Sequence, residues 1–197
     1  MPWCRYADDG LVHCKSEQQA NEILAKLKQR FGECKLELHP DKTKIVYCKD
    51  KTRRGNYPIT SFDFLGYCFR PRTSRNRRTN QLFLNFTHGV SKSAMKAMRA
   101  EIRKSNIRNR THVSLKQIAL DYNPILNGWI AYYGRYNKWA LYPVLRHFNR
   151  TLVAWVMRKY KSYRSDKTGA AQFMMKIHQN QPNLFAHWKI GMVCTFA

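Results

Sequence analysis

The sequence predicts an α+β protein in which a mixed strand-and-helix segment precedes an all-helical segment. Short runs of alternating apolar and polar residues in the first half are typical of half-buried strands. From Ser91 onward, apolar residues recur every three or four positions, as they do on one face of a helix. Hydrophobic residues make up 44% of the 197 residues, which is enough for a packed core. We therefore expect a mixed domain over residues 1–88 and a helical domain over residues 89–197.

The first half is expected to form a hairpin, one helix and further short strands. Asp9-Gly10 stands between two strand-like runs and predicts a hairpin turn. Ser16, with Gln19 three residues on, is a capping box that predicts a helix start, and Gly32 predicts its end. Strands are also predicted at 35–39, 45–48, 62–69 and 82–86, with a charged loop at 49–58 and a basic loop at 70–78.

The second half is expected to be helical throughout. A first helix is predicted from Ser91 to Lys104, and Ser114 with Gln117 caps a second. Pro124 is expected to interrupt or restart that helix. Further segments follow: a long helix with Pro143 in its first turn that ends at residue 163, a helix at 168–179, and an aromatic tail at 183–189 that docks on the core.

The charge balance indicates a polyanionic partner. Lys and Arg number 36 against 12 Asp and Glu, a formal net charge of +24. Nucleic acid is the first candidate and an anionic membrane surface the second. No apolar run approaches the ~20 residues of a membrane span, and the first residues do not resemble a signal peptide. The six cysteines lack zinc-site spacing, so we expect reduced, mostly buried thiols in a cytoplasmic protein.

Asp8 and Asp9 are the most informative acidic residues. They stand together at the predicted hairpin tip, in a chain that is poor in acids. Two carboxylates in this position supply hard oxygen ligands for Mg²⁺, and paired metal ions stabilise phosphoryl transfer. A solvated Asp-Asp-Gly turn is the alternative that the pair alone leaves open.

Four blocks in order carry a family resemblance. The first is Arg-Tyr-Ala-Asp-Asp at residues 5–9, and the second is His-Pro-Asp-Lys-Thr-Lys-Ile at 39–45. The third is Phe-Asp-Phe-Leu-Gly-Tyr at 62–67 with Phe-Arg-Pro-Arg at 69–72, and the fourth is Asn-Pro-Ile-Leu-Asn-Gly-Trp at 123–129 with Tyr-Tyr-Gly at 132–134. Together they resemble the bacterial group II intron reverse transcriptase/maturase family, over nearly the whole chain.

The resemblance implies a fold, an activity and ligands. Residues 1–88 would be the C-terminal part of a polymerase palm, and residues 89–197 the thumb or maturase domain X. Family members copy an RNA template into DNA by extending a DNA primer with dNTPs and Mg²⁺. They also bind their own intron RNA to help it splice. By resemblance Asp8 and Asp9 would be catalytic metal ligands, and Lys42 would lie near the triphosphate as a catalytic proton donor. The primer grip would be Phe64, Leu65, Gly66 and Tyr67.

A further set of residues is predicted to contact RNA, because basic side chains bind phosphates and aromatic rings stack on unpaired bases. A plain solvated charge run is the alternative for the basic members. The predicted contacts are Arg70, Arg72, Arg75, Arg77, Arg78, Lys92, Arg99, Arg103, Lys104, Tyr132, Arg135 and Tyr136.

The sequence also departs from the family pattern. Full-length members carry fingers and earlier palm strands, with another catalytic aspartate, before the point that matches Arg5. We therefore expect this chain to be a fragment that is inactive as a polymerase by itself, with a complementing N-terminal chain as one partner. The alternative is a stand-alone, non-catalytic RNA-binding maturase-like protein that assists splicing. A basic interaction protein unrelated to introns would leave the four blocks unexplained.

Overall fold

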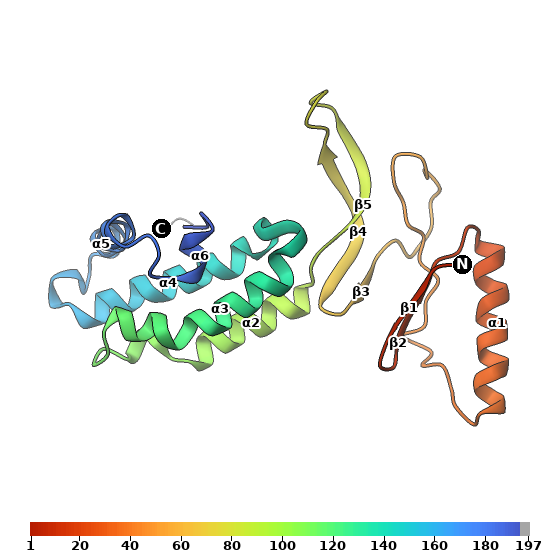
Figure 1. Ribbon diagram of the computed structural model, residues 1–197, viewed down its shortest axis with the longest axis horizontal. Helices are drawn as coiled ribbons and strands as arrows, with labels where there is room; N and C mark the ends of the chain where they lie inside the picture. Colours follow the sequence, from red (N-terminus) through yellow and green to blue (C-terminus); the bar gives the residue numbers. More distant parts are fainter. Residues whose placement is uncertain (194–197) are drawn as a thin grey trace. The chain divides into compact units, whose positions relative to one another are not determined.

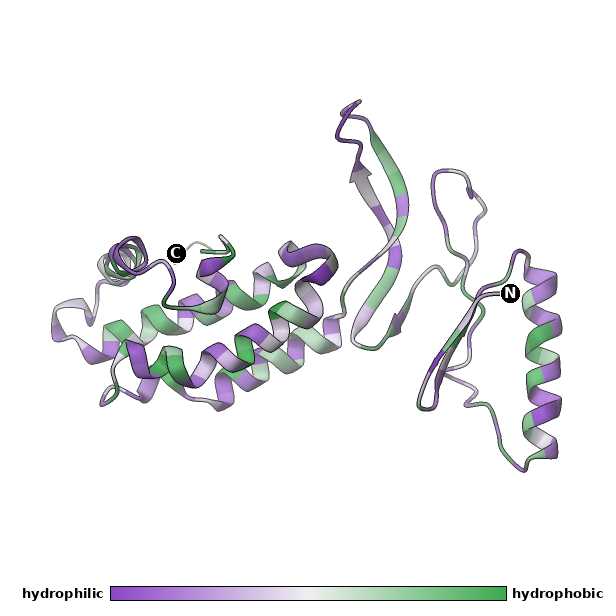
Figure 2. Ribbon diagram, viewed as in Figure 1, coloured by the Kyte–Doolittle hydropathy of each residue, from purple (hydrophilic) through white to green (hydrophobic). Residues whose placement is uncertain are grey.

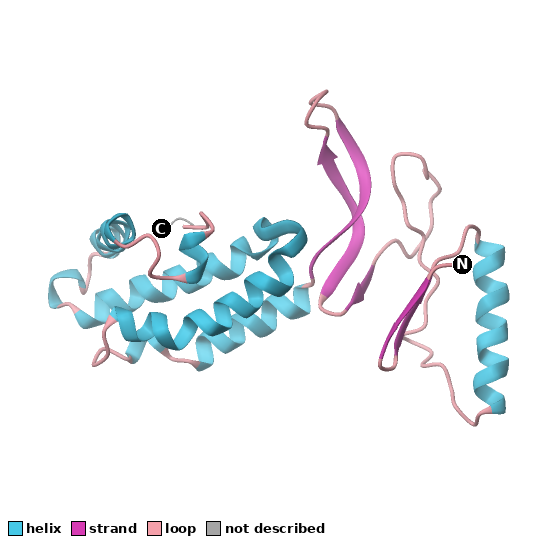
Figure 3. Ribbon diagram, viewed as in Figure 1, coloured by secondary structure: helices cyan, strands magenta, loops and turns pink. Residues whose placement is uncertain are grey.

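The computed structural model describes residues 1–193, apart from the side chain of Tyr136. The chain divides into two compact units. Unit 1 comprises Met1–Phe64 and Phe69–His88, and unit 2 comprises Leu65–Cys68 and Gly89–Ala197. Unit 1 holds strands and one helix and unit 2 is helical, so the predicted α+β class is confirmed (Figure 3). Within the part of the chain that is described, no helix has the length and apolar character needed to cross a membrane.

The elements follow the order labelled in Figure 1. The strands are β1 (Trp3–Tyr6), β2 (Asp9–Val12), β3 (Phe62–Phe64), β4 (Tyr67–Arg75) and β5 (Leu82–Val90). The α-helices are α1 (Glu17–Glu33), α2 (Lys92–Lys104), α3 (Leu115–Asn137), α4 (Tyr142–Lys159), α5 (Lys167–Asn180) and α6 (Ala186–Lys189). Short 3₁₀ turns are η1 (Ile107–Asn109), η2 (Lys138–Leu141) and η3 (Lys161–Tyr163).

The β1–β2 hairpin turns two residues earlier than the sequence predicts. Tyr6 pairs with Asp9, so the two-residue loop is Ala7-Asp8, and Gly10 lies within β2 opposite Arg5. Ala7 takes φ 52°, the positive value that a tight hairpin turn requires at its first central residue. The Arg5 Nε donates a hydrogen bond to the Ala7 carbonyl at 2.8 Å and stabilises this register.

Helix α1 begins where the capping box predicts it. The Ser16 hydroxyl accepts from the Gln19 backbone N–H at 3.2 Å, and the Gln19 side chain accepts from the Lys15 N–H at 2.8 Å. The helix runs past Gly32, and Lys35 adopts the left-handed conformation (φ 55°) that ends it. The Leu36 N–H donates to the Phe31 carbonyl at 2.8 Å, which completes a Schellman motif with lysine in place of glycine.

No residue of α1 is fully buried. Its apolar stripe, visible in green in Figure 2, is half-buried at Ile23, Leu24 and Phe31, and Leu27 is exposed. Among the described residues, the buried apolar side chains all lie at Val90 or beyond. The packed core therefore belongs to unit 2.

Two predicted strands are wrong. Residues 35–39 and 45–48 have no strand assignment in the structure, although the first segment alternates like a half-buried strand and the second is a short run of strand-forming residues. A strand forms only where its backbone groups pair with a neighbouring strand. The Tyr47 N–H does bond the Ile59 carbonyl at 2.9 Å, but this contact does not extend into a ladder.

The predicted strand over 62–69 is instead a hairpin. Strands β3 and β4 are joined by Leu65 and Gly66, both with positive φ (48° and 76°), as a type I′ turn requires. The sheet order is β3-β4-β5. The predicted basic loop at 70–78 is wrong in its first part, because β4 continues to Arg75 and pairs with a longer β5 that runs to Val90.

Unit 2 is built around α4, which buries most of its faces. The largest fully buried side chains of unit 2 are Trp155, Phe148, Phe185, Ile102, Ile107, Ile118, Leu126, Leu141, Leu145, Leu152, Met174 and Met192. The Ser114 hydroxyl caps α3 as predicted, at 3.2 Å, and the Ser91 hydroxyl caps α2 at 3.1 Å. Pro143 lies in the first turn of α4, but the helix ends at Lys159 rather than at 163.

Pro124 does not interrupt α3, contrary to the prediction. Proline costs a helix one hydrogen bond, and packing of a long helix against a core outweighs that loss. Tyr122 before Pro124 and Leu126 after it are both buried, so burial on both sides of Pro124 keeps the helix continuous.

The aromatic tail docks on the core as predicted. Asn123 of α3 holds it from one side: its Nδ2 donates to the Leu184 carbonyl at 2.9 Å, and its Oδ1 accepts from the Ala186 N–H at 2.8 Å. From the other side, the Asn149 Oδ1 lies 2.8 Å from the His187 Nε2. His187 and Trp188 are both buried.

Candidate nucleic-acid interface

The acidic pair lies at the tip of the β1–β2 hairpin. Asp8 occupies the turn and Asp9 begins β2, and both are exposed. Since Asp8 is in the loop, the two carboxylates are not forced onto opposite faces of a strand. Mg²⁺ is commonly bound by one or two carboxylates, with water and substrate phosphates completing its shell. The pair fits that role, but no group of three acidic, His or Cys side chains that could hold a metal occurs within residues 1–193.

Lys42 lies in the turn after Pro40, where the Thr43 N–H bonds the His39 carbonyl at 2.9 Å. Its side chain is exposed. The structure therefore presents Lys42 to solvent on a short closed turn, and its role near a triphosphate stays a prediction.

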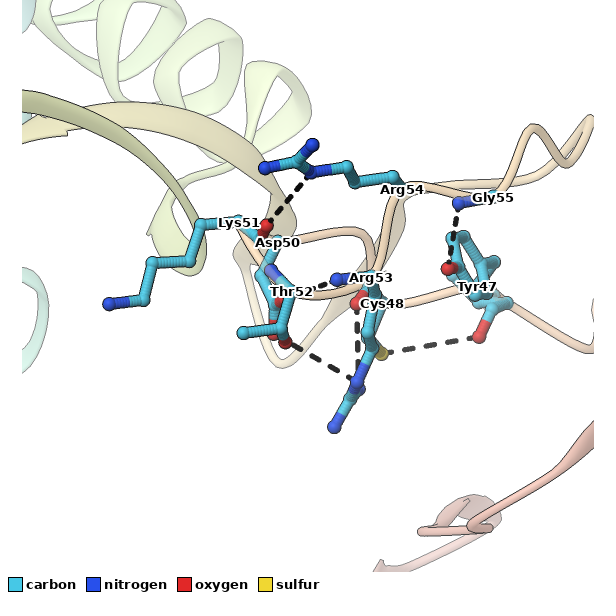
Figure 4. Close-up of polar contacts among 9 residues, drawn as sticks. Tyr47, Cys48, Asp50, Lys51, Thr52, Arg53, Arg54 and Gly55 are labelled. Carbon is cyan, nitrogen blue, oxygen red and sulfur yellow. Dashed lines mark hydrogen bonds and ion pairs between the residues drawn. The ribbon is translucent and has the colours of Figure 1, made fainter.

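The charged segment after it is an ordered loop (Figure 4). The Asp50 carboxylate accepts from the Thr52 hydroxyl at 2.7 Å and from the backbone N–H groups of Thr52 and Arg53 at 2.8 and 2.9 Å. These bonds lower the pKa of Asp50 below its usual value. Lys51 anchors the loop to β5, because its N–H donates to the Leu84 carbonyl at 2.9 Å. The loop therefore holds its basic side chains on a defined backbone.

The Leu65-Gly66 turn is bound to α3 within unit 2. The Tyr132 hydroxyl donates to the Leu65 carbonyl at 2.9 Å, and the Tyr67 hydroxyl donates to the Tyr132 carbonyl. The Ser91 N–H donates to the Gly66 carbonyl at 2.9 Å. Both carbonyls of the turn are thus engaged, and three of the four predicted primer-grip residues belong to the same compact unit as α3.

Position 66 requires glycine because of a close contact with a side chain as well as because of its positive φ. A Cβ built on Gly66 would lie 2.6 Å from the Tyr133 hydroxyl oxygen. The rings of Tyr67 and Tyr133 lie 5.4 Å apart, and burial raises the pKa of Tyr133. Tyr132 was predicted to contact RNA; its hydroxyl is used by the turn, although 48% of the residue stays exposed. Its ring face is what remains for stacking.

The predicted basic contacts of the sheet are divided between strand and turn. Arg70 and Arg75 are exposed on β4, and Arg72 of the same strand is half-buried. Arg77 and Arg78 are exposed in the β4–β5 turn, where the Arg78 N–H donates to the Asn76 Oδ1 at 2.9 Å. Four of the five are therefore presented to solvent.

Helix α2 carries a cationic stripe. At 100° per residue, Lys92, Lys96, Arg99 and Arg103 fall within an arc of about 60°, beside the face that buries Met98 and Ile102. Lys104 lies outside this arc and is exposed. Arg135 is exposed on α3, and the side chain of Tyr136 lies outside the described part of the chain.

Sequence reasoning missed three cationic or titratable residues of α4. Arg146, His147 and Arg150 lie on the part of α4 that is not fully buried, and α2 packs against α4. Arg99, Arg103 and Arg150 lie close enough to His147 to act on its charge. The i, i+4 spacing of Arg146 and Arg150 could have indicated a basic face on this helix. Only the packing of the structure shows that α2 lies against α4.

The thiols differ from the prediction in burial. Cys4 and Cys34 are exposed, and Cys14, Cys48 and Cys68 are half-buried. Cys4, Cys14, Cys34 and Cys48 are free thiols, as predicted. Burial raises the pKa of Cys48. Cys194 lies outside the described residues.

Two family models match the chain in the order that the blocks predict. The model described as reverse transcriptase (RNA-dependent DNA polymerase) matches residues 1–69. The model described as group II intron, maturase-specific domain matches residues 95–173. The chain belongs to the group II intron reverse transcriptase/maturase family. Comparison with curated proteins and with solved structures gives no match.

The two matches place the described sites in context. The reverse transcriptase segment contains the acidic hairpin, Lys42, the ordered loop and the Leu65-Gly66 turn. The maturase-specific segment contains most of α2 and all of α3 and α4. Proteins of this family work on nucleic acid, and reverse transcriptases are metal-dependent polymerases in general.

Proposed function

We propose that this chain binds group II intron RNA as a maturase, mainly through unit 2. The main support for this proposal is the match of residues 95–173 to the maturase-specific domain, in a chain whose formal net charge is +24. The cationic stripe of α2 supports it, because lysine and arginine side chains bind phosphates without regard to sequence. The self-packed core of unit 2 holds these side chains on a rigid surface.

Filter binding with the full chain tests this function. A group II intron RNA and an unrelated RNA of equal length are compared at several salt concentrations. With 6–10 phosphate contacts, affinity should fall about 10³–10⁵-fold between about 50 and 200 mM salt. We expect the intron RNA to bind more tightly than the unrelated RNA at every salt concentration. A flat salt response, or equal affinity for both RNAs, would contradict the proposal.

We further propose that Asp8 and Asp9 bind Mg²⁺, as ligands of a polymerase metal site whose other partners are an RNA template, a DNA primer and a dNTP. Mg²⁺ supplies charge stabilisation for phosphoryl transfer in such sites. Support comes from the reverse transcriptase match and from the exposed position of both carboxylates at one hairpin tip. Lys42 and the Leu65-Gly66 turn would contact the triphosphate and the primer.

Paramagnetic Mn²⁺ tests the metal site without relying on activity. In NMR spectra of the full chain, Mn²⁺ should broaden the amide signals of residues 7–10 selectively. Asp8→Asn combined with Asp9→Asn should abolish that broadening. Asp63→Asn, at an exposed acid of β3, should leave it unchanged. Broadening that survives the double substitution would refute the assignment.

A further inference from the structure

A short basic loop of unit 1 presents cations to solvent on an ordered backbone. We call residues 49–55 the Asp50 loop. Its four basic residues, Lys49, Lys51, Arg53 and Arg54, stand against one acid, Asp50. Lys51, Arg53 and Arg54 are exposed. The loop therefore offers an excess of positive charge to a partner.

The one acid of the loop is occupied inside it. Three hydrogen bonds of 2.7 to 2.9 Å, from Thr52 and Arg53, hold the Asp50 carboxylate. The Arg53 Nε lies 3.9 Å from the Asp50 Oδ2. The other two salt bridges found among residues 1–193 lie in α1 and between Arg110 and Asp121, so neither involves this loop. Within that range, no carboxylate pairs with the cations of Lys51 and Arg54.

The positions of these two cations are set by contacts of the loop itself. The Lys51 N–H donates to the Leu84 carbonyl of β5 at 2.9 Å, and the Lys51 Nζ lies 5.7 Å from the centre of the Phe83 ring. The Arg54 Nε donates to the Lys51 carbonyl at 3.4 Å (Figure 4). Among the described residues, the terminal guanidinium nitrogens of Arg54 make no other hydrogen bond. They can therefore donate to an added anion.

Two tyrosines brace the far end of the loop. The rings of Tyr47 and Tyr57 lie 4.3 Å apart, and the Gly55 N–H donates to the Tyr47 hydroxyl at 3.1 Å. A Cβ built on Gly55 would lie 2.8 Å from the Tyr57 ring, so glycine is what allows the loop to approach both rings. A loop that is ordered before binding loses less conformational entropy when a ligand arrives.

We propose that Lys51 and Arg54 bind backbone phosphates of a nucleic-acid strand. The planar guanidinium of arginine donates to phosphate oxygens in pairs, and the lysine ammonium attracts them as a point charge. The proposal rests on the function above only in taking nucleic acid as the polyanion, and it adds a contact in unit 1 to the proposed surface of unit 2.

Nucleic acid is favoured over an anionic membrane surface for two reasons. Residues 49–55 include no apolar side chain that could enter a bilayer. The loop also lies within residues 1–69, which match the reverse transcriptase model. Phosphate contacts of this kind hold the backbone and carry no sequence information, so RNA and DNA strands should both bind.

Salt-dependent binding of single-stranded polyuridine RNA and polythymidine DNA to the full chain tests the proposal. The test variant combines Lys51→Gln and Arg54→Gln. The control removes the same charge at exposed lysines of α1, by Lys26→Gln and Lys28→Gln. Each phosphate contact adds about 0.7 to the slope of log K against log salt for single strands. The test variant should lose about 1.4 from that slope with both nucleic acids, and the control should keep the parental slope.

The outcomes separate the loop from the RNA-binding function. If the parent binds RNA with a salt-dependent affinity but the test variant and the control keep equal slopes, the loop proposal is refuted and the RNA-binding function stands. If the parent shows no salt-dependent binding of either nucleic acid, both proposals fail. A slope lost with RNA alone would assign the contact to the ribose hydroxyls and contradict phosphate binding.

Two further measurements locate the contact. In NMR spectra of the full chain, polyuridine RNA should shift the amide signals of residues 51–54 at low salt, and the shifts should disappear at high salt. Unchanged signals over these residues at saturation would overturn the proposal. Sedimentation with phosphatidylserine vesicles covers the membrane alternative: weaker vesicle binding by the test variant, with an unchanged slope for RNA, would assign the loop to a membrane surface instead.

Discussion

Protonation of His187 should destabilise unit 2 at mildly acidic pH. His187 is fully buried in α6 with its Nε2 2.8 Å from the Asn149 Oδ1, an acceptor to which the Trp188 Nε1 also donates at 3.4 Å. We infer that Nε2 carries the proton of a neutral ring. The other nitrogen, Nδ1, has no hydrogen-bond partner among residues 1–193. A second proton would therefore place an unpaired charge in the core.

The magnitude follows from linkage. Burial, with a smaller contribution from the charge of His178, lowers the pKa of His187 from 6.5 to about 3. Below pH 6.5 the unfolded chain binds a proton at this position and the folded chain does not, so stability falls as pH falls. Each pH unit costs about 1.4 kcal/mol. Between pH 6.5 and 4.5 this single residue should remove about 3 kcal/mol from the free energy of unfolding.

Urea unfolding from pH 7.5 to 4.5, followed by tryptophan fluorescence, measures this loss. His187→Gln keeps a neutral hydrogen-bond donor and removes the titration, so its free energy of unfolding should fall less steeply than that of the parent. The difference in slope should be about 1.4 kcal/mol per pH unit. His112→Gln, at an exposed histidine, is the control. Parallel curves for the parent and His187→Gln would show that the buried ring is protonated in the folded state, and the reasoning would be wrong.

Three further predictions use the same unfolding assay. Gly66→Ala should cost at least 1–2 kcal/mol, roughly the penalty of a positive φ, because its Cβ would also meet the Tyr133 hydroxyl; Gly128→Ala, in open space on α3, should be neutral or stabilising. Asn123→Ala should cost about 1–3 kcal/mol and expose the Leu184–Ala186 backbone to hydrogen exchange, whereas exposed Asn127→Ala should do neither. Added salt should raise the urea midpoint, since it screens the repulsion of 36 bases against 12 acids; a midpoint that falls with salt would contradict this.

Local signals in the sequence were sufficient for the helix starts. Ser16, Ser91 and Ser114 each cap the helix that follows, because a serine hydroxyl needs only the backbone N–H three residues on. The positive φ of Gly66 is equally local, because glycine pays no steric penalty there. These features depend on neighbours in the chain and can be found by inspection.

Non-local pairing accounts for the errors. Residues 35–39 alternate like a strand and residues 45–48 are rich in strand-forming side chains, but strand formation depends on a partner that the pattern cannot specify. At Pro124 the error is the opposite one, because a break was predicted and none occurs. Proline tends locally to break a helix, and the burial of Leu126 and its neighbours overrides that tendency. The late start of the basic loop likewise reflects pairing of β4 with β5.

The candidate sites divide in the same way. Asp8, Asp9 and the Leu65-Gly66 turn were named as candidates from the sequence, since each lies in a contiguous block. The cations around His147 were identified in part: Arg99 and Arg103 were named from the sequence and Arg150 was not, because its approach to them depends on how α2 packs against α4. Tyr132 was predicted from the sequence to contact RNA. Its hydrogen bond to the Leu65 carbonyl was not predicted, because it joins residues far apart in the chain.

The sequence by itself determined the family, the α+β class, the excess of positive charge and the acidic hairpin, because each is carried by composition or by residues adjacent in the chain. Tertiary structure decided which predicted strands exist, that α3 continues through Pro124, that the Leu65-Gly66 turn is bound by tyrosines of α3, and that arginines from two helices converge on His147. These outcomes depend on contacts between residues far apart in sequence, where the free energy of burial and pairing outweighs local preference.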